Sequence, residues 1–268
     1  MNISLEILYN LSSIFYKGKI VIKKINEKQN ILNDNIGFVE NWDFSKANLN
    51  EENRILAITQ VASICYQNPK ALGSESLYNR LMAESMGLPS SSFEFVPVLL
   101  DYENPNHQEI LKLEYSNCKK FGEILDDRYL LTNYRALVYD FENDKDKFSF
   151  DIRTIFNTQE ECKIIKEYFK VFLFKVDFPT RSQMVSEKLK ENQKVKDLIK
   201  QSEDLYFELL ENGVKPQEAR RVIPQMGYTQ IWGAFMPKQL DNYFKLGLDE
   251  HAQWEIRQTA LAMQELIK

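Results

Sequence analysis

The stretch KPQEARRVIPQMGYTQIWGAFMPKQLDNYFKLGLDEHAQWEIR, residues 215–257, holds the densest set of structural and chemical signals in the sequence. Pro216 suits the first turn of a short helix, where its missing N–H leaves no helical hydrogen bond unmade. The apolar face of this helix comprises Ala219, Val222 and Ile223. Arg220 and Arg221 lie at its edge. Paired arginines at a helix end are most often solvated, but beside an apolar surface a guanidinium suits a bidentate contact with a phosphate or carbonyl.

The sequence ends in LDEHAQWEIRQTALAMQELIK, residues 248–268, which predicts a final helix. Its apolar stripe recurs at helical spacing and comprises Ala252, Ile256, Ala260, Met263 and Ile267. His251, one of only two histidines, lies at the start of this segment. From the pattern alone, an ordinary helix explains His251 better than a binding site does.

Upstream, helical and strand patterns follow one another without βαβ regularity, which predicts an α+β fold with a mixed or antiparallel sheet flanked by helices. We expect helices in residues 51–85 (two, separated by a turn), 107–125, 158–168 and 186–210. We expect strands in residues 91–102, 128–141 and 168–178.

The composition limits the classes of function. Hydrophobic residues make up 44% and aromatic residues 12%, which is ample for a core. A net charge of −5 argues against a nucleic-acid surface. The apolar runs VFLF and VPVLL are too short to span a bilayer, and MNISLEILYNLSS lacks a basic region and a cleavage site. We therefore expect a cytoplasmic protein without nucleic-acid or membrane partners.

The three cysteines are Cys65, Cys118 and Cys162, which are far apart and odd in number. They indicate buried thiols rather than a disulfide framework or a metal site. No GxGxxG, Walker, HExxH or GxSxG motif is present. Any chemistry must therefore come from a cofactor or from arginines and amides.

The segments EARRVIPQMGYT, QLDNYFKL and LDEHAQWEIRQTALAM resemble the C-terminal half of the flavin-dependent thymidylate synthases, the ThyX family. That family has an Ala-Arg-x-Val-Leu-Pro helix, an Asn-x-Arg-x-Leu segment and a final Ala-Gln-Trp-Glu-Ile. VASICY, SSFEF and FKVDFPTRSQMV are similar, in order, to earlier family stretches. The resemblance covers most of residues 55–268. It implies one domain over residues 1–268, with an N-terminal extension at 1–50 and an insertion at 101–160.

The resemblance implies an activity. ThyX enzymes methylate dUMP to dTMP with methylenetetrahydrofolate as carbon donor, NADPH as reductant and FAD as hydride carrier. They are homotetramers with active sites between subunits, and no cysteine attacks the pyrimidine. The alternatives are a related methylase or hydroxymethylase of another pyrimidine nucleotide, and a catalytically inactive homologue that binds flavin or nucleotide.

The resemblance also implies site residues. Arg220 and Gln183 resemble the family's contacts with dUMP. The positions that resemble its FAD contacts are Ser91, Glu94, Lys238, Asn242, Leu246 and His251.

Three departures from the family affect this interpretation. After Gln183 the family has Arg-His-Arg and Ser-x-Arg-Tyr, which are missing here. Gly247 stands where the family has an arginine that activates the pyrimidine, so no catalytic residue is assigned with certainty. The family's Asn-x-Arg is MPK, residues 236–238. Asn133 and Arg135 in TNYRAL repeat the lost pattern, although an ordinary strand with an exposed arginine explains them equally well.

The missing signature has two explanations. Either the chain is a catalytically inactive relative, or the polypeptide carries a loop between Val185 and Ser186 that this sequence omits. Both flanks still match the family's strand and helix, and QMVSEKLK contains no turn residue other than Ser186. We therefore favour the omitted loop.

Overall fold

The computed structural model describes residues 13–16, 19–25, 28–31, 37–66, 71–83, 89–176, 189, 191–223 and 230–268. Over these residues the protein is α+β, as the sequence predicts, and every strand pairing is antiparallel. Gln183 and the Val185–Ser186 junction fall outside the described residues. The proposed loop at that junction therefore stays a prediction.

The larger sheet has six strands in the order β1-β2-β4-β8-β9, with β3 also paired to β4. They are β1 (Ser13–Tyr16), β2 (Lys19–Lys24), β3 (Gln29–Ile31), β4 (Gly37–Asp43), β8 (Lys170–Val176) and β9 (Ile231–Phe235). In the centre, Phe38 of β4 lies opposite Lys175 of β8, and Trp42 lies opposite Val171. Residues 1–50, which we expect to be an extension, therefore supply a central strand.

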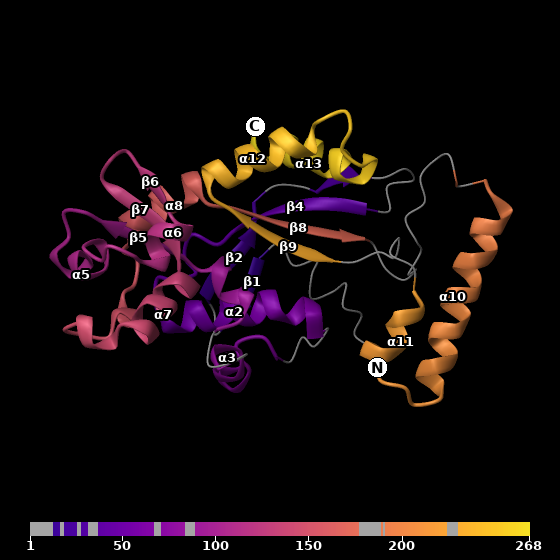
Figure 1. Ribbon diagram of the computed structural model, residues 1–268, viewed down its shortest axis with the longest axis horizontal. Helices are drawn as coiled ribbons and strands as arrows, with labels where there is room; N and C mark the ends of the chain where they lie inside the picture. Colours follow the sequence, from indigo (N-terminus) through magenta and orange to yellow (C-terminus); the bar gives the residue numbers. More distant parts are fainter. Residues whose placement is uncertain are drawn as a thin grey trace.

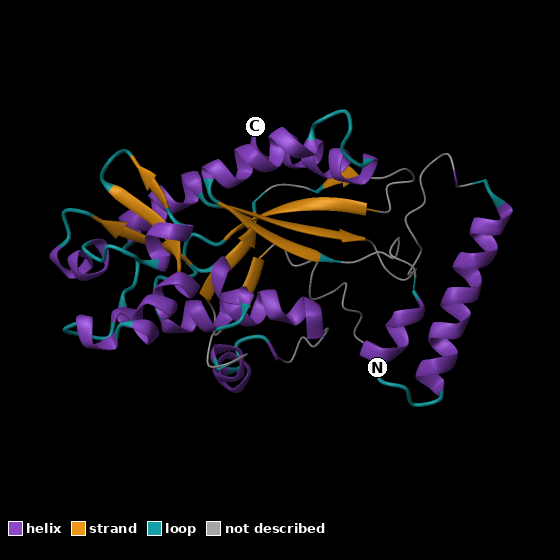
Figure 2. Cartoon of the chain, viewed as in Figure 1, coloured by secondary structure: helices purple, strands orange, loops and turns teal. Residues whose placement is uncertain are grey.

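The two faces of this sheet belong to different hydrophobic cores, because successive side chains of a strand point to opposite faces. Val171 and Leu173 of β8 lie in one core, whereas Phe172 lies in the other. Helix α2 (Glu51–Tyr66) covers the first face, and α3 (Glu75–Met82) packs against α2. Helices α12 (Pro237–Gly247) and α13 (Trp254–Ile267) cover the second. Figures 1 and 2 show the sheet between these two pairs of helices.

A smaller sheet, in the order β5-β7-β6, contains β5 (Pro97–Asp101), β6 (Glu123–Leu125) and β7 (Tyr129–Asn133). Around it lie α5 (Gln108–Leu111), α6 (Asn117–Phe121), α7 (Tyr134–Asn143) and α8 (Gln159–Tyr168). Residues 101–160, the expected insertion, supply most of this unit. Buried Arg54 of α2 ties it to the main core by donating to the carbonyl oxygens of Arg153 and Ile155, at 2.9 and 3.0 Å.

Helix α10 (Gln193–Glu211) packs against α11 (Pro216–Ala219) and the following turn η7 (Arg220–Val222). Figure 1 shows α10 and α11 together, to one side of both sheets. Only Ser202 and Tyr206 of α10 are buried, whereas its apolar residues Leu198, Leu205 and Phe207 are exposed. Among the described helices, none is both long enough and apolar enough to cross a membrane.

Three expected elements are wrong in whole or in part. Within residues 91–102, the first five form a 3-10 turn, and strand β5 begins only at Pro97. Residues 107–125 are not one helix but the short helices α5 and α6 followed by strand β6. Residues 128–141 are a strand only as far as Asn133. There the side-chain Oδ1 of Asn133 accepts the N–H of Ala136 at 3.0 Å and caps the start of α7.

Candidate functional site

Three of the residues that resemble FAD contacts lie along one side of α12. Lys238, Asn242 and Leu246 are each one helical turn apart, which places them on the same face. All three are exposed, Leu246 to 63%. The opposite side of α12 packs into the second core through Leu240 and Phe244. We call Lys238, Asn242 and Leu246 the α12 stripe; it offers an ammonium, an amide and an apolar side chain to a ligand.

His251 lies beyond the end of the α12 stripe, in the turn between α12 and α13. The Oδ1 of Asp249 accepts the backbone N–H of His251 at 2.8 Å and lies 3.0 Å from its ring Nδ1. These hydrogen bonds lower the pKa of Asp249 below its usual value. The His251 side chain is 85% exposed, and its Nε2 lies 4.0 Å from Oε1 of the exposed Glu250. The turn thus holds the imidazole without burying it.

Gly247, where the family has an arginine, is buried at the end of α12. A Cβ on this glycine would lie 3.2 Å from the Cβ of Ala260 and 3.5 Å from Cγ2 of Ile256, both on α13. The missing side chain therefore lets α12 and α13 approach closely. Glycine has a packing role here, and any side chain at this position would have to shift Ala260 by a few tenths of an ångström.

The start of α12 carries a contact that sequence analysis missed. The backbone N–H of Lys238 donates to Oε2 of Glu123 at 2.9 Å. Glu123 belongs to β6, 115 positions earlier in the chain. A helix N-terminus attracts anionic groups, including those of ligands. At the start of α12, the carboxylate of Glu123 occupies that position. No local signal identifies Glu123, because only the fold brings β6 to α12.

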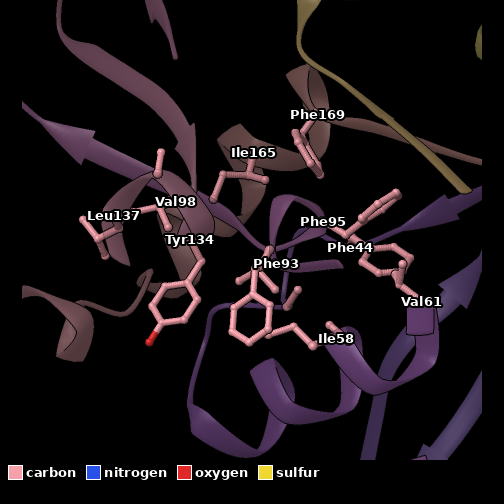
Figure 3. Close-up of a cluster of buried hydrophobic side chains, with 14 of the residues drawn as sticks. Phe44, Ile58, Val61, Phe93, Phe95, Val98, Tyr134, Leu137, Ile165 and Phe169 are labelled. Carbon is pink, nitrogen blue, oxygen red and sulfur yellow. The ribbon is translucent and has the colours of Figure 1, made fainter. Parts of the chain in front are cut away.

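Ser91 and Glu94 lie in the turn η3 (Ser91–Phe95), with both residues exposed. The turn is anchored by Phe93 and Phe95, which Figure 3 shows in the cluster beside Ile58 and Val61 of α2. Ser90 caps the start of the turn, because its Oγ accepts the N–H of Ser92 at 3.3 Å. The buried phenylalanines thus leave the alternate positions Ser91 and Glu94 at the surface.

The large sheet separates η3 from the α12 stripe. Phe95 of η3 packs against Trp232, with ring centroids 6.5 Å apart, in the core beneath the first face. Phe235, on the same strand β9, points to the other face and lies 5.4 Å from the ring of Tyr243 on α12. One chain therefore does not bring the two sets of predicted FAD contacts into a single pocket.

The predicted dUMP contact Arg220 begins η7, and its side chain is exposed. Its neighbour Arg221 forms an exposed ion pair with Glu218, with Nε and Oε2 3.2 Å apart. The apolar face expected for this short helix is partly present, because Ala219 is buried while Val222 and Ile223 are half-buried. Arg220 lies on the α10–α11 unit rather than beside the α12 stripe.

The sequence left two interpretations of Arg135: part of a repeat of the lost Asn-x-Arg pattern, or an exposed arginine in an ordinary strand. It is neither in a strand nor fully exposed: it lies in the first turn of α7, with 27% of its side chain accessible. Its guanidinium contacts η3, donating from Nη1 to Oε1 of Glu94 and from Nε to the carbonyl oxygen of Pro89. The fold thus joins Arg135 to a predicted FAD contact.

The described residues contain no group of three side chains suited to a metal ion. Cys118 and Cys162 are buried, as expected; the side chain of Cys65 is outside the description. Burial raises the pKa of the Cys162 thiol to about 11 and that of Cys118 well above its usual value. Neither thiol is poised as a nucleophile, because the thiolate is the reactive form.

Comparison with known proteins finds relatives of this chain in one family. Residues 146–268 match the family model described as thymidylate synthase complementing protein. The resemblance to the ThyX family is confirmed over this segment. The flavin-dependent thymidylate synthase of Thermosipho africanus is 43% identical over 80 residues, which are 28% of this chain and 35% of that protein. That of Saccharolobus solfataricus is 39% identical over 107 residues, 40% of this chain and 37% of that protein.

The enzyme of the same name from Aquifex aeolicus is 30% identical over 109 residues, 39% of this chain and 34% of that protein. Each of these matches spans little more than a third of the relative's length. The α12 stripe, His251 and Arg220 all lie inside the ThyX-like segment, whereas Ser91, Glu94 and Arg135 precede it.

Proposed function

We propose that the protein is a flavin-dependent thymidylate synthase that methylates dUMP to dTMP, using methylenetetrahydrofolate and NADPH. The observation that carries the proposal is the α12 stripe. Lys238, Asn242 and Leu246 occupy one exposed helix face within the ThyX-like segment, with the imidazole of His251 beyond them. A flat ring system with polar edges can pack on an exposed apolar side chain and interact with the polar side chains beside it.

These residues fit FAD on chemical grounds. Lys238 would neutralise a phosphate, Asn242 would donate to or accept from polar ring edges, and Leu246 would pack against the ring. His251 would accept a hydrogen bond at Nε2, because its Nδ1–H faces the carboxylate of Asp249. Bound flavin would supply hydride transfer, which no side chain can provide. Arg220 would bind the dUMP phosphate, and Gln183 would contact the same nucleotide.

We propose that FAD lies between subunits of a homotetramer. The separation of η3 from the α12 stripe by the sheet supports this arrangement, because Ser91 and Glu94 of one chain would complete the site of another. The exposed apolar side chains of α10 support it as well, since a face with Leu198 and Leu205 unburied is typical of an interface. We place the enzyme in the cytoplasm, without nucleic-acid or membrane partners.

A second candidate is a catalytically inactive homologue that still binds flavin or nucleotide. The buried Gly247 favours it, because this position lacks the family's activating arginine and a Cβ here would already lie 3.2 Å from the Cβ of Ala260. Tritium release from 5-labelled dUMP, with all co-substrates present, separates the two. Release above a no-enzyme control supports the synthase, and flavin binding without release supports the inactive homologue.

Flavin binding itself is tested by titrating FAD against the purified protein. Lys238→Ala together with Asn242→Ala should weaken binding by about tenfold, since each lost polar contact is worth about 0.5–1.5 kcal/mol. The matched control is Lys163→Ala on α8, an exposed lysine in an ion pair with Glu160. Equal affinities for wild type and the double variant would remove the α12 stripe from the site.

A further inference from the structure

Arg135 forms hydrogen bonds with both ends of the segment that contains Ser91 and Glu94. Nε of Arg135 donates to the carbonyl oxygen of Pro89 at 2.8 Å, and Nη1 donates to Oε1 of Glu94. The Cζ atom lies 5.2 Å from the ring centroid of Tyr139, one turn along α7. Since a guanidinium is planar and its donors are fixed in direction, these contacts set the position of η3 relative to α7.

The arrangement leaves part of the Glu94 carboxylate open. Within the described residues, Oε1 is held by Arg135, whereas Oε2 has no hydrogen-bond partner. The Glu94 side chain is 46% exposed, and the hydroxyl of Ser91 is exposed on the same turn. An ionised, oriented carboxylate with one free oxygen can accept from a hydroxyl or N–H of a ligand.

The ion pair between Arg135 and Glu94 contributes little to folding. Half-exposed pairs of this kind add little to stability. The turn is already anchored by Phe93, which stacks on Tyr134 at 6.0 Å, and by the buried Phe95. Asn133 caps α7 whether or not Arg135 is present. The contact therefore fixes the direction of a surface carboxylate and contributes little to the core.

We propose that Arg135 is a positioning residue, which holds Glu94 and the η3 backbone in the orientation that binds flavin. This proposal rests on the proposed function, in which Glu94 contacts FAD. It assigns a role to a residue that precedes the ThyX-like segment of residues 146–268. Arg135 itself does not touch the flavin; it acts through Glu94.

The test is a double-mutant cycle on FAD affinity, measured by flavin fluorescence in the full-length protein. Arg135→Leu and Glu94→Gln should each raise the Kd for FAD by about tenfold. The double variant should bind no more weakly than the weaker single variant, because both changes disable the same carboxylate. Arg135→Lys, which keeps a cation near Glu94 but not the fixed fork of donors, should recover only part of the affinity. Thermal unfolding of every variant should stay close to that of the wild type.

The matched control is Arg128→Leu. Arg128 pairs with Asp101 through Nε and Nη2, at 3.2 and 2.8 Å, at the far end of the β5–β7 pair. Losing this ion pair should leave FAD affinity unchanged. The proposal is overturned if Arg135→Leu leaves the Kd within about twofold of wild type, or if the two single effects multiply in the double variant. A wild-type protein that binds no FAD would defeat the proposed function as well, whereas the first two results defeat only the role of Arg135.

Discussion

Replacing Gly247 with arginine restores the family's residue, yet we expect it to destabilise the protein. The new Cβ would lie 3.2 Å from the Cβ of Ala260, closer than ordinary van der Waals contact, and the rest of the side chain would have to pass Ile256 or Tyr243. Because α13 is held against β3 and β4 by buried Met263, it cannot move away freely.

The magnitude follows from two opposing effects. Overpacking a close contact costs about 1–3 kcal/mol, while replacing glycine in a helix regains up to about 1 kcal/mol. With the middle of the first range, about 2 kcal/mol, the net loss is about 1–2 kcal/mol, which lowers the melting temperature of a domain of this size by about 2–8 °C. Gly247→Ala should show the smaller end of this range, since only the Cβ is added.

Thermal unfolding followed by circular dichroism measures this effect. Leu246→Arg is the matched control for stability, because it places the same side chain one position earlier on the exposed face, where nothing crowds it. Adding Ala260→Gly to Gly247→Ala should restore part of the loss by removing the atom that the new Cβ meets. The reasoning is refuted if Gly247→Arg melts at or above the wild-type temperature.

Three further outcomes follow from buried groups. Arg54→Met should lower the free energy of unfolding, measured by chemical denaturation, by about 3 kcal/mol. The carbonyl of Ile155 and other buried acceptors would lose a charged donor. A loss below about 1 kcal/mol would contradict this reasoning. Burial lowers the pKa of His107, so its contribution to stability is present above about pH 6.5 and is lost as the pH falls through its lower folded value. Wild type should therefore lose more unfolding free energy than His107→Gln between about pH 7 and pH 5, and equal losses would refute the assignment. Cys162 should react with iodoacetamide at about pH 8 far more slowly than in urea, as peptide mass spectrometry would show, because its raised pKa keeps the thiol protonated.

Local sequence predicted the elements whose signals are complete within a few residues. The capping box of α8 is an example: Thr158 Oγ1 accepts the N–H of Glu161, and the Glu161 carboxylate accepts the N–H of Thr158. The long amphipathic pattern of α10 and the proline at the start of α11 also predicted helices that are present. The apolar run of β8 predicted a strand, and the structure buries side chains of that strand on both of its faces.

Local sequence failed where a distant partner decides the conformation. Residues 107–125 look helical, but α6 ends at Phe121 and β6 pairs with β7 instead. Asp140, from α7, accepts the backbone N–H groups of Asn117 and Cys118 at 2.6 and 3.0 Å and so holds the start of α6. No window around α6 contains that carboxylate.

In the final helix, too, local sequence predicts one property and tertiary contacts decide another. Its existence follows from its periodicity, but its buried side is Ala260, Ala262, Met263 and Leu266 rather than the whole predicted stripe. Ile256 and Ile267 are exposed to 40% and 36%. The helix packs against both the sheet and α12, so two directions of contact select its buried residues.

The sequence by itself determined the α+β class, the resemblance of residues 146–268 to the ThyX family and the one-sided spacing of Lys238, Asn242 and Leu246. These depend on periodicity and on residue identity, which are local properties. Only the tertiary structure decided that the sheet separates Glu94 from the α12 stripe, that Arg135 holds Glu94, and that Gly247 is buried against α13. These three features are contacts between segments that are distant in the sequence. Strand pairing and core packing determine such contacts, and no short stretch of the chain carries a signal for them.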